Sequence, residues 1–377
     1  MNQMYEGNAG RVFSFGAAQA ASLAVAAVCL FLGLFSCPPL YAIGRNYEVR
    51  QIAPHTFVWI PDDIMDQSGD PYFNRAVNVG FIITPAGVVV LDTANNPFHA
   101  REVLYEIRQR TELPVRLVID MGPQGDQMLG NEVFAEQHAT IVSTSAAEAG
   151  MQDYDQELSK RLSFDSELFT RMRGIHFTLP GQTFHGQTSF NIGGTEIRLA
   201  AFNCGLPGTH AGDAVAYVPQ EKVLFLGDLY VHGFVPQIGP RNVSRWISVL
   251  GQVEKWDVMT YVPGHGNPGT HADVATFRGF LEWLNAGVEA GVRQGKTLQD
   301  VEQQLLSSSA FNLLGLDLAP RTIAAVYHQI VNARSAHVAP PPGALPLRVP
   351  EGRDNAVPPA NSAQGFRSLP AAPLTHP

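Results

Sequence analysis

The 377-residue sequence contains only three cysteines, and two of these lie in an apolar stretch near the N-terminus. Cys29 is inside that stretch and Cys37 is at its end, so Cys204 is the one cysteine in the rest of the chain. A single cysteine cannot form an internal disulfide, and it is more often a small buried apolar residue than a nucleophile. A disulfide-stabilised scaffold is therefore excluded.

Basic residues are also scarce. The chain has 25 Lys and Arg against 34 Asp and Glu, a formal net charge of −9 at pH 7, and the basic residues are not clustered. A nucleic-acid surface would need such a cluster on one face, so nucleic acid is excluded as a partner. Apolar residues are plentiful at 45%, which is enough for one large core or two small ones.

Charge is absent from residues 13–35, which are mostly Ala, Leu, Val and Phe. This run is long enough for a membrane anchor, which needs about 20 apolar residues. It also fits a cleaved signal peptide, because Pro38 and Pro39 end the apolar segment just before a small-residue cleavage site at Ala42.

Residues 1–42 are therefore interpreted as a signal peptide or a membrane anchor, and cleavage is favoured. Membrane attachment through residues 13–35, or a lipid on Cys37, stays open as an alternative. Each interpretation predicts an exported chain that is periplasmic or extracellular.

Hydrophobic periodicity and turn residues predict alternating strands and helices after residue 47. The predicted strands are 78–83, 88–91, 115–119, 140–143, 189–192, 195–202, 214–218 and 223–226. Two helices are predicted to begin at 95–97 and near 129, and three more are predicted over 146–173, 243–254 and 271–293. Thr297 and Asp300 form a capping pair that predicts a short helix, and a last helix is predicted to run to about 331. Two successive strand-then-helix halves favour two sheets packed face to face with helices outside.

Residues 335–377 are rich in Pro, Ala and Ser and contain few large apolar side chains. Such a composition cannot bury enough apolar surface to fold, so this segment is predicted to be a disordered tail. Residues 47–334 remain as one folded domain.

The loop after the predicted strand 115–119 carries Asp126 and the pair Gly130-Asn131. A loop at the carboxyl end of a strand, opening a helix, is where α/β proteins place their chemistry. Three further loops carry Gly212-Asp213, Gly227-Asp228 and Gly264-His265. In this order the four loops closely resemble those of the metallo-β-lactamase superfamily, whose first loop reads His-x-His-x-Asp-His and is followed by a Gly-Asn pair.

The resemblance implies an α/β (α+β) fold, a four-layer αββα sandwich of the metallo-β-lactamase type. Superfamily members that hydrolyse C–O, C–N or thioester bonds hold one or two metal ions, usually zinc, between the two sheets. Zinc takes three or four His, Cys or carboxylate ligands and keeps one position open for water. It then lowers the pKa of that water to about 7.

On this resemblance, Asp126, Asp228 and His265 stand at metal-ligand positions, and Asp126 is also the candidate catalytic residue. Taken singly, each has an ordinary explanation: a helix cap, a turn residue after a strand and a hydrogen-bonded loop histidine. The matching order and spacing favour the inherited metal positions.

The three histidine places of the first loop are taken by Gly122, Gln124 and Gln127. Glycine offers no side-chain ligand, and carboxamides are poor zinc ligands beside imidazole. In the second loop Thr209 stands at the histidine place, and a one-residue shift would bring His210 in as a fourth ligand. Gln124, Gln127 and Thr209 are instead candidates for substrate binding.

These substitutions favour an exported protein with a degraded zinc site, non-catalytic or barely catalytic, that binds a small ligand or partner in the former active-site cleft. Such a protein is expected to bind no cofactor, or a single weakly held divalent metal ion, of which zinc is the first candidate. The alternative is a one-metal hydrolase acting on a lactone, lactam or thioester bond, with a small molecule as its substrate.

Overall fold

The computed structural model describes residues 47–62, 76–166, 175–207, 209, 212–308, 310, 313 and 316–338, and only the backbone for 335–338. The predictions for residues 1–42 and for His210, and all but the first residues of the predicted tail, lie outside this part of the chain. Among the helices described, none combines the length and the apolar character needed to cross a membrane.

The first sheet has seven strands, which follow one another across the sheet in sequence order. The first four strands pair antiparallel, and the fourth to the seventh pair parallel. The strands are β1 (Tyr47–Gln51), β2 (Thr56–Pro61), β3 (Val79–Thr84), β4 (Gly87–Leu91), β5 (Val115–Ile119), β6 (Thr140–Thr144) and β7 (Gln182–Phe184).

The second sheet has five strands in the order β12, β11, β10, β9 and β8. The strands from β8 to β11 form an antiparallel meander, and β12 pairs parallel to β11. Their bounds are β8 (Gln187–Ile192), β9 (Thr195–Phe202), β10 (Asp213–Val218), β11 (Val223–Val231) and β12 (Thr260–His265).

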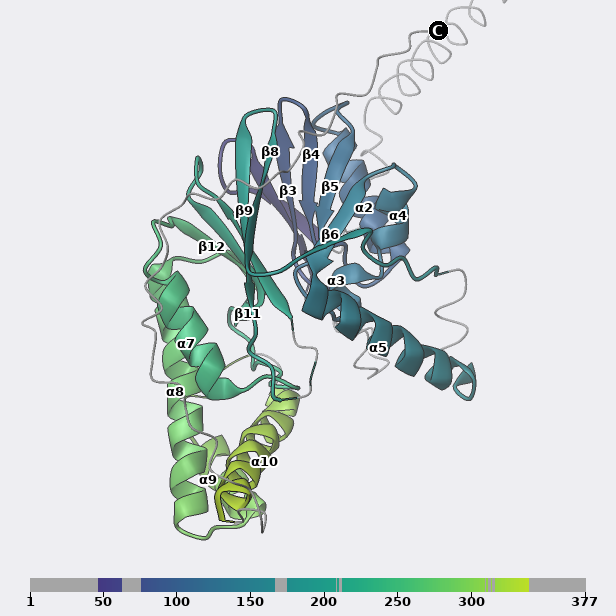
Figure 1. Cartoon of the computed structure of the whole chain (residues 1–377). Coiled ribbons are helices and arrows are strands. Elements are labelled where there is room, and N and C mark those ends of the chain that lie inside the picture. Colours follow the sequence, from purple (N-terminus) through teal and green to yellow (C-terminus); the bar gives the residue numbers. More distant parts are fainter. Residues whose placement is uncertain are drawn as a thin grey trace, which may run out of the picture. The chain divides into compact units, whose positions relative to one another are not determined.

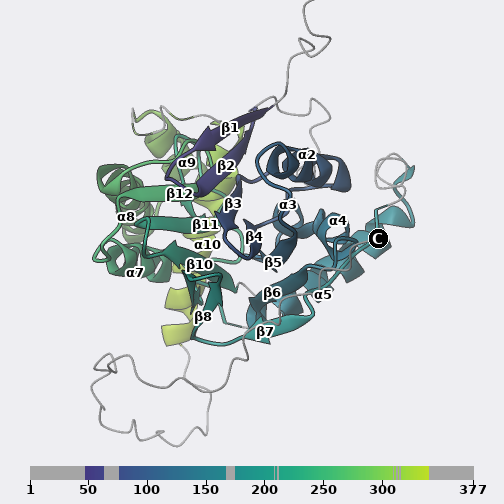
Figure 2. The same ribbon diagram turned by 90° about the horizontal axis from the view of Figure 1, so that it is seen from above.

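The helices lie on the outer sides of the two sheets (Figures 1 and 2). On the side of the first sheet are α2 (Pro97–Arg108), α3 (Gly125–Met128), α4 (Asn131–Ala135) and α5 (Ser145–Leu162). On the side of the second are α7 (Val243–Val253), α8 (His271–Arg293), α9 (Leu298–Leu306), the 3₁₀ turn η2 (Leu316–Leu318) and α10 (Ala319–Val338). The described chain is therefore a four-layer αββα sandwich, as the sequence predicted.

Side-chain alternation on the strands separates the layers of the core. On β4, Val89 and Leu91 pack between the two sheets, whereas Val88 and Val90 point to the opposite face and pack under α2. Successive strand residues point to opposite faces, so a strand buried on both faces is continuously apolar. Full burial of each such side chain stabilises the fold by about 1.5–3 kcal/mol.

The loop after β5 differs from the prediction. The helix expected to start near Leu129 begins at Gly125, breaks, and resumes as α4 at Asn131. At the break, the carbonyl of Gln127 accepts both the backbone N–H of Thr93, at 2.6 Å, and its hydroxyl, at 3.1 Å, which takes up both lone pairs. It is therefore not available to a helical amide further along the chain.

Four further strands, β1, β2, β7 and β12, were not among the predicted strands. Helix α10 continues to Val338, beyond the predicted end near 331. The long polar helix expected over 146–173 ends at Leu162, and residues 167–174 lie outside the described chain. Its first turns, through Ala147 and Met151, pack beside Met128 of α3.

Candidate active site

Two residues after β4 hold the loop between β5 and α3. Asp92 is buried with a left-handed backbone (φ 60°), and its Oδ1 accepts the backbone N–H of Met121 at 2.7 Å. Thr93 donates its backbone N–H to Gln127. The carbonyl of Met121 accepts the backbone N–H of Ala214 at 2.7 Å, which joins the loop to the second sheet. The loop is thus fixed between the sheets.

A side chain at residue 122 would meet the ends of two glutamine side chains, which would have to move to admit it. A Cβ at this position would be 2.2 Å from Oε1 of Gln127 and 2.7 Å from Oε1 of Gln124. The Gln127 side chain is fully buried, and its Oε1 accepts the backbone N–H of Gln124 at 3.4 Å. Two carboxamides therefore fill the space that a side chain at residue 122 would enter.

The three residues predicted to keep their positions come together. Nε2 of His265 is 3.3 Å from Oδ2 of Asp126 and 3.5 Å from Oδ1 of Asp228. Their side chains are 18%, 21% and 13% exposed, so solvent reaches all three. Asp126 comes from α3, beside the first sheet, whereas Asp228 and His265 come from adjacent strands of the second.

Asn78, just before β3, holds the His265 loop against the first sheet. Its backbone N–H donates to the carbonyl of Gly264 at 2.7 Å. Its side-chain amide donates to the carbonyls of Pro263 and Gly266 at 3.0 and 2.7 Å. These bonds fix the position of His265 from both sides.

A bulge in β11 places Asp228. The pairing of β11 with β12 shifts register on both sides of Gly227, whose φ is 50°. A positive φ costs glycine little and other residues more, so Gly227 allows this turn of the chain. Asp228 then lies beside Arg241 of the loop before α7, with Nη2 of Arg241 3.8 Å from its Oδ2.

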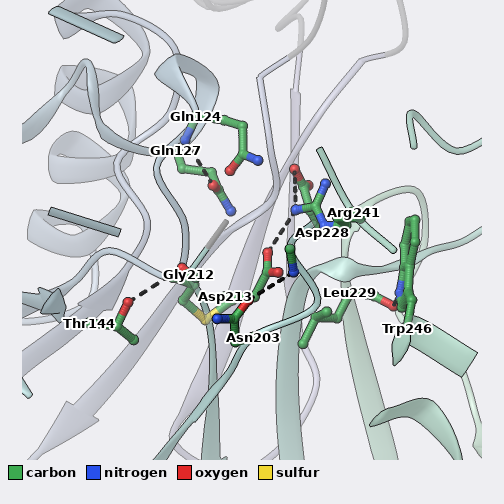
Figure 3. Close-up of polar contacts among 12 residues, drawn as sticks. Gln124, Gln127, Thr144, Asn203, Gly212, Asp213, Asp228, Leu229, Arg241 and Trp246 are labelled. Atoms are coloured by element: carbon green, nitrogen blue, oxygen red, sulfur yellow. Dashed lines mark hydrogen bonds and ion pairs between the residues drawn. The ribbon is translucent and has the colours of Figure 1, made fainter. Parts of the chain in front are cut away.

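Arg241 is buried and bridges two carboxylates (Figure 3). The same Nη2 donates to Oδ1 of Asp213 at 2.7 Å, and the guanidinium lies 5.3 Å from the centroid of the Trp246 ring. Burial alone would lower the pKa of Arg241. The neighbouring carboxylates of Asp213 and Asp228 together raise this pKa by more than burial lowers it, so the net shift is upward. The side chain is therefore permanently charged.

Carboxyl groups at the site have raised pKa values. Burial, then Asp126, raises the pKa of Asp228, and His265 and Arg241 partly oppose this. Burial raises the pKa of Asp120 to about 8, against a hydrogen bond that Asn131 donates at 2.8 Å. The pKa of Asp92 is raised as well, by burial and by nearby carboxylates. Charge is thus costly here unless a cation is present.

The second loop is described only in part. Thr209 donates its hydroxyl to the carbonyl of Leu206 at 2.8 Å, so its hydroxyl stabilises a turn of the loop. His210 lies outside the described residues. Cys204 is fully buried, and burial raises the pKa of its thiol to about 12, in keeping with the predicted apolar role.

The donor set does not fit a two-metal centre. In the described chain, no group of three or more His, Cys, Asp and Glu side chains is arranged to hold a metal ion. Both carboxylates approach the same nitrogen of His265 and so pair with it directly. Carboxamides fill the space beside Gly122, and a guanidinium takes the other oxygen of Asp228.

Arg241 was missed in the sequence because it belongs to no recognised motif. One signal was present: it is the only Asp, Glu, Lys or Arg between Asp228 and Arg245. A single charged residue in a segment that is otherwise uncharged is often buried with the segment, and a buried charge needs a partner of opposite sign. Asp213 was noted only as part of the loop frame, and its pairing with Arg241 could not be inferred.

No family model and no curated protein matches the sequence. Among solved structures, a metallo-beta-lactamase from Pontibacter korlensis is 18% identical, with a TM-score of 0.47 over 63% of this chain and 99% of that one. A double mutant of the sec-alkyl sulfatase PisA1 is 16% identical, with a TM-score of 0.55 over 78% of this chain. The match spans 52% of the sulfatase, about half its length. With the strand order and the layers described above, the similarity to the sulfatase structure gives the chain the αββα fold of the metallo-β-lactamase type.

Proposed function

We propose that the protein binds a small molecule or a partner at the site formed by Asp126, Asp228 and His265, and that it does not hydrolyse it, or barely does. The observation that carries the proposal is the packing at Gly122. Hydrolysis in this fold depends on a metal-bound water, and the first metal would need side-chain donors at this point of the loop. The carboxamides of Gln124 and Gln127 are there instead.

Unpaired polar atoms beside these carboxamides support ligand binding. Oε1 of Gln124 and Nε2 of Gln127 are buried and have no hydrogen-bond partner among the described residues. Oδ1 of Asp228 is buried as well, and it has an ion-pair contact of 3.5 Å with Nε2 of His265 but no hydrogen bond among the described residues. A buried polar atom without a partner costs about 1–3 kcal/mol, which a ligand or a water can remove. A ligand that accepts from Gln127 and donates to Gln124 and Asp228 would satisfy all three. Thr209, from the partly described second loop, remains a candidate for further contact.

A second candidate function is hydrolysis of a lactone, lactam or thioester bond with one divalent ion, most simply zinc. The observation that favours it is the approach of two carboxylates to one imidazole nitrogen, with all three side chains partly exposed. Asp126, Asp228 and His265 would hold the ion, with His210 as a fourth ligand. The ion would polarise the substrate carbonyl and supply an activated water.

Elemental analysis of purified protein tests the proposal. We expect at most one divalent ion per chain, lost on dialysis against a mild chelator without a change in melting temperature. Two tightly held zinc ions would overturn the proposal and favour a hydrolase. Replacing Gly122, Gln124 and Gln127 together by histidine should raise zinc affinity, because it supplies the missing donors and removes the carboxamides.

We further propose that the protein acts outside the cytoplasm, in the periplasm or beyond it. The proposal rests on the apolar run 13–35 and the proline pair that follows it. A retained anchor would place the same site at a membrane surface.

A further inference from the structure

Arg241 is a buried cation at the site. The residue is 4% exposed, and its partner Asp213 is 2% exposed. Its Nη2 donates to Asp213, whereas its Nε has no hydrogen-bond partner among the described residues. A guanidinium is not placed in such surroundings without carboxylates to balance it, because moving an unpaired charge from water into the interior costs several kcal/mol.

The two carboxylates in turn need the positive charge of the guanidinium. Asp213 and Asp228 both lie beside Nη2 of Arg241, at 2.7 and 3.8 Å. Two carboxylates this close in a buried region repel each other, and one or both would take up protons unless a cation lay between them. Arg241 is that cation, and its charge does not depend on pH in the usual range.

We infer that the guanidinium of Arg241 is a built-in replacement for a metal ion at Asp228. It balances the carboxylate that a divalent ion would otherwise balance, and it excludes such an ion by charge repulsion and by occupying the second oxygen of Asp228. This inference rests on the proposed absence of a two-metal centre, and it assigns the exclusion of metal to one residue outside the four metal-binding loops.

The test is a gain of metal binding on removal of the cation. Arg241→Met keeps the length and apolar stem of the side chain while leaving Asp228 unbalanced. Titration of this variant with zinc chloride or manganese chloride should show about tenfold or more tighter binding than the unmodified protein, the range in which changes around a metal site act. Its melting temperature should fall without metal and recover with it, whereas that of the unmodified protein should not respond.

Two controls assign the effect to position 241. Arg245→Met removes an exposed arginine from the same segment, whose side chain donates to the carbonyl of Gly205, and should leave metal binding unchanged. Adding Asp228→Asn to Arg241→Met should abolish the gain. Arg241→Lys keeps a positive charge and should still exclude metal.

If Arg241→Met does not fold without metal, the double variant Arg241→Met/Asp213→Asn removes the second unbalanced charge and should fold and gain metal affinity. Equal metal affinity of the folded variants and the unmodified protein would overturn the inference alone. The inference would also be overturned if Arg241→Met stays unfolded in the presence of zinc while the double variant folds and shows no gain in metal affinity. Tight zinc binding by the unmodified protein would instead overturn the proposed function as well.

Discussion

In the loop after β5, the side chain of Gln127 occupies the space that the absent side chain of Gly122 leaves open. This carboxamide is fully buried. Protein interiors are close-packed, so such a pair behaves as one unit and a change at one residue is felt at the other. The residues at these two positions therefore form a packing arrangement of their own.

Gly122→Ala should lower the free energy of unfolding by about 1–3 kcal/mol, because the added methyl forces Gln127 out of its position. In a Gln127→Ala background the same change should cost much less. Urea denaturation of the two single variants and the double variant measures this coupling. Gly279→Ala, where a Cβ meets nothing within 4 Å in the interior of α8, should instead raise stability by about 0.5–1 kcal/mol. Additive effects of Gly122→Ala and Gln127→Ala would contradict the proposed packing.

Asp120 should make stability depend on pH. Burial raises its pKa from the ordinary 3.8 to about 8, so the folded chain keeps a proton that the unfolded chain loses. This contribution to stability is fully present below about pH 4 and is lost as the pH rises to 8, with a slope of up to about 1.4 kcal/mol per pH unit. Asp120→Asn cannot titrate, so its free energy of unfolding should fall less steeply over this range.

Urea denaturation at a series of pH values compares the two slopes. Asp317→Asn, at an exposed position, controls for the loss of a negative charge. Parallel curves for the unmodified protein and Asp120→Asn would show that the carboxyl is already ionised in the folded chain. Asp92, whose pKa is raised in the same direction, should leave a residual slope in the variant.

At the scale of elements, strong local signals in the sequence predicted the structure well. The Gly193-Gly194 turn joins β8 and β9 as expected, because both residues have positive φ and favour a two-residue hairpin loop. The helix over His271–Arg293 has its predicted bounds, since Thr270 and Asp273 form a capping box at its start. The break between α3 and α4 could not be predicted, because Thr93, which donates to the carbonyl of Gln127 there, is far away in the sequence. The three-residue strand β7 is too short and too exposed for periodicity to detect.

Thr144 should anchor the start of α5. Its hydroxyl oxygen accepts the backbone N–H of Ala147 at 2.9 Å and lies 3.4 Å from the carbonyl of Gly212. Thr144→Ala should cost about 1 kcal/mol of stability through loss of the N-cap, and Thr144→Ser should retain most of it. Amide hydrogen exchange in the first turns of α5 should speed up in the alanine variant and stay slow in the serine variant. Equal exchange in both variants would show that the cap does not hold the helix.

At the scale of the whole molecule, the site is assembled from segments more than a hundred residues apart. Asp126 comes from one half of the sandwich, and Asp228 and His265 from the other. Their convergence was predicted from the resemblance of the loops, in their order along the chain, to those of the metallo-β-lactamase superfamily. The pairing of Arg241 with Asp213 depends on how a loop without a motif packs, and no local pattern encodes that packing.

Export should appear in the mass of the mature protein. The apolar run and the proline pair predict that an expressed chain loses its first 36 to 42 residues or retains them in the membrane fraction. Intact-mass spectrometry of the soluble and membrane fractions tests both forms. A full-length chain in the soluble cytoplasmic fraction would refute them together.

The packing at Gly122 also has a consequence for redesign. A histidine at residue 122 alone would meet the oxygen of Gln127, and a histidine at 127 alone would face a glycine that binds nothing. We therefore expect neither single substitution to create a metal site. On the proposed function, such a site lies two coupled substitutions away, and only a simultaneous change at both positions would reach it.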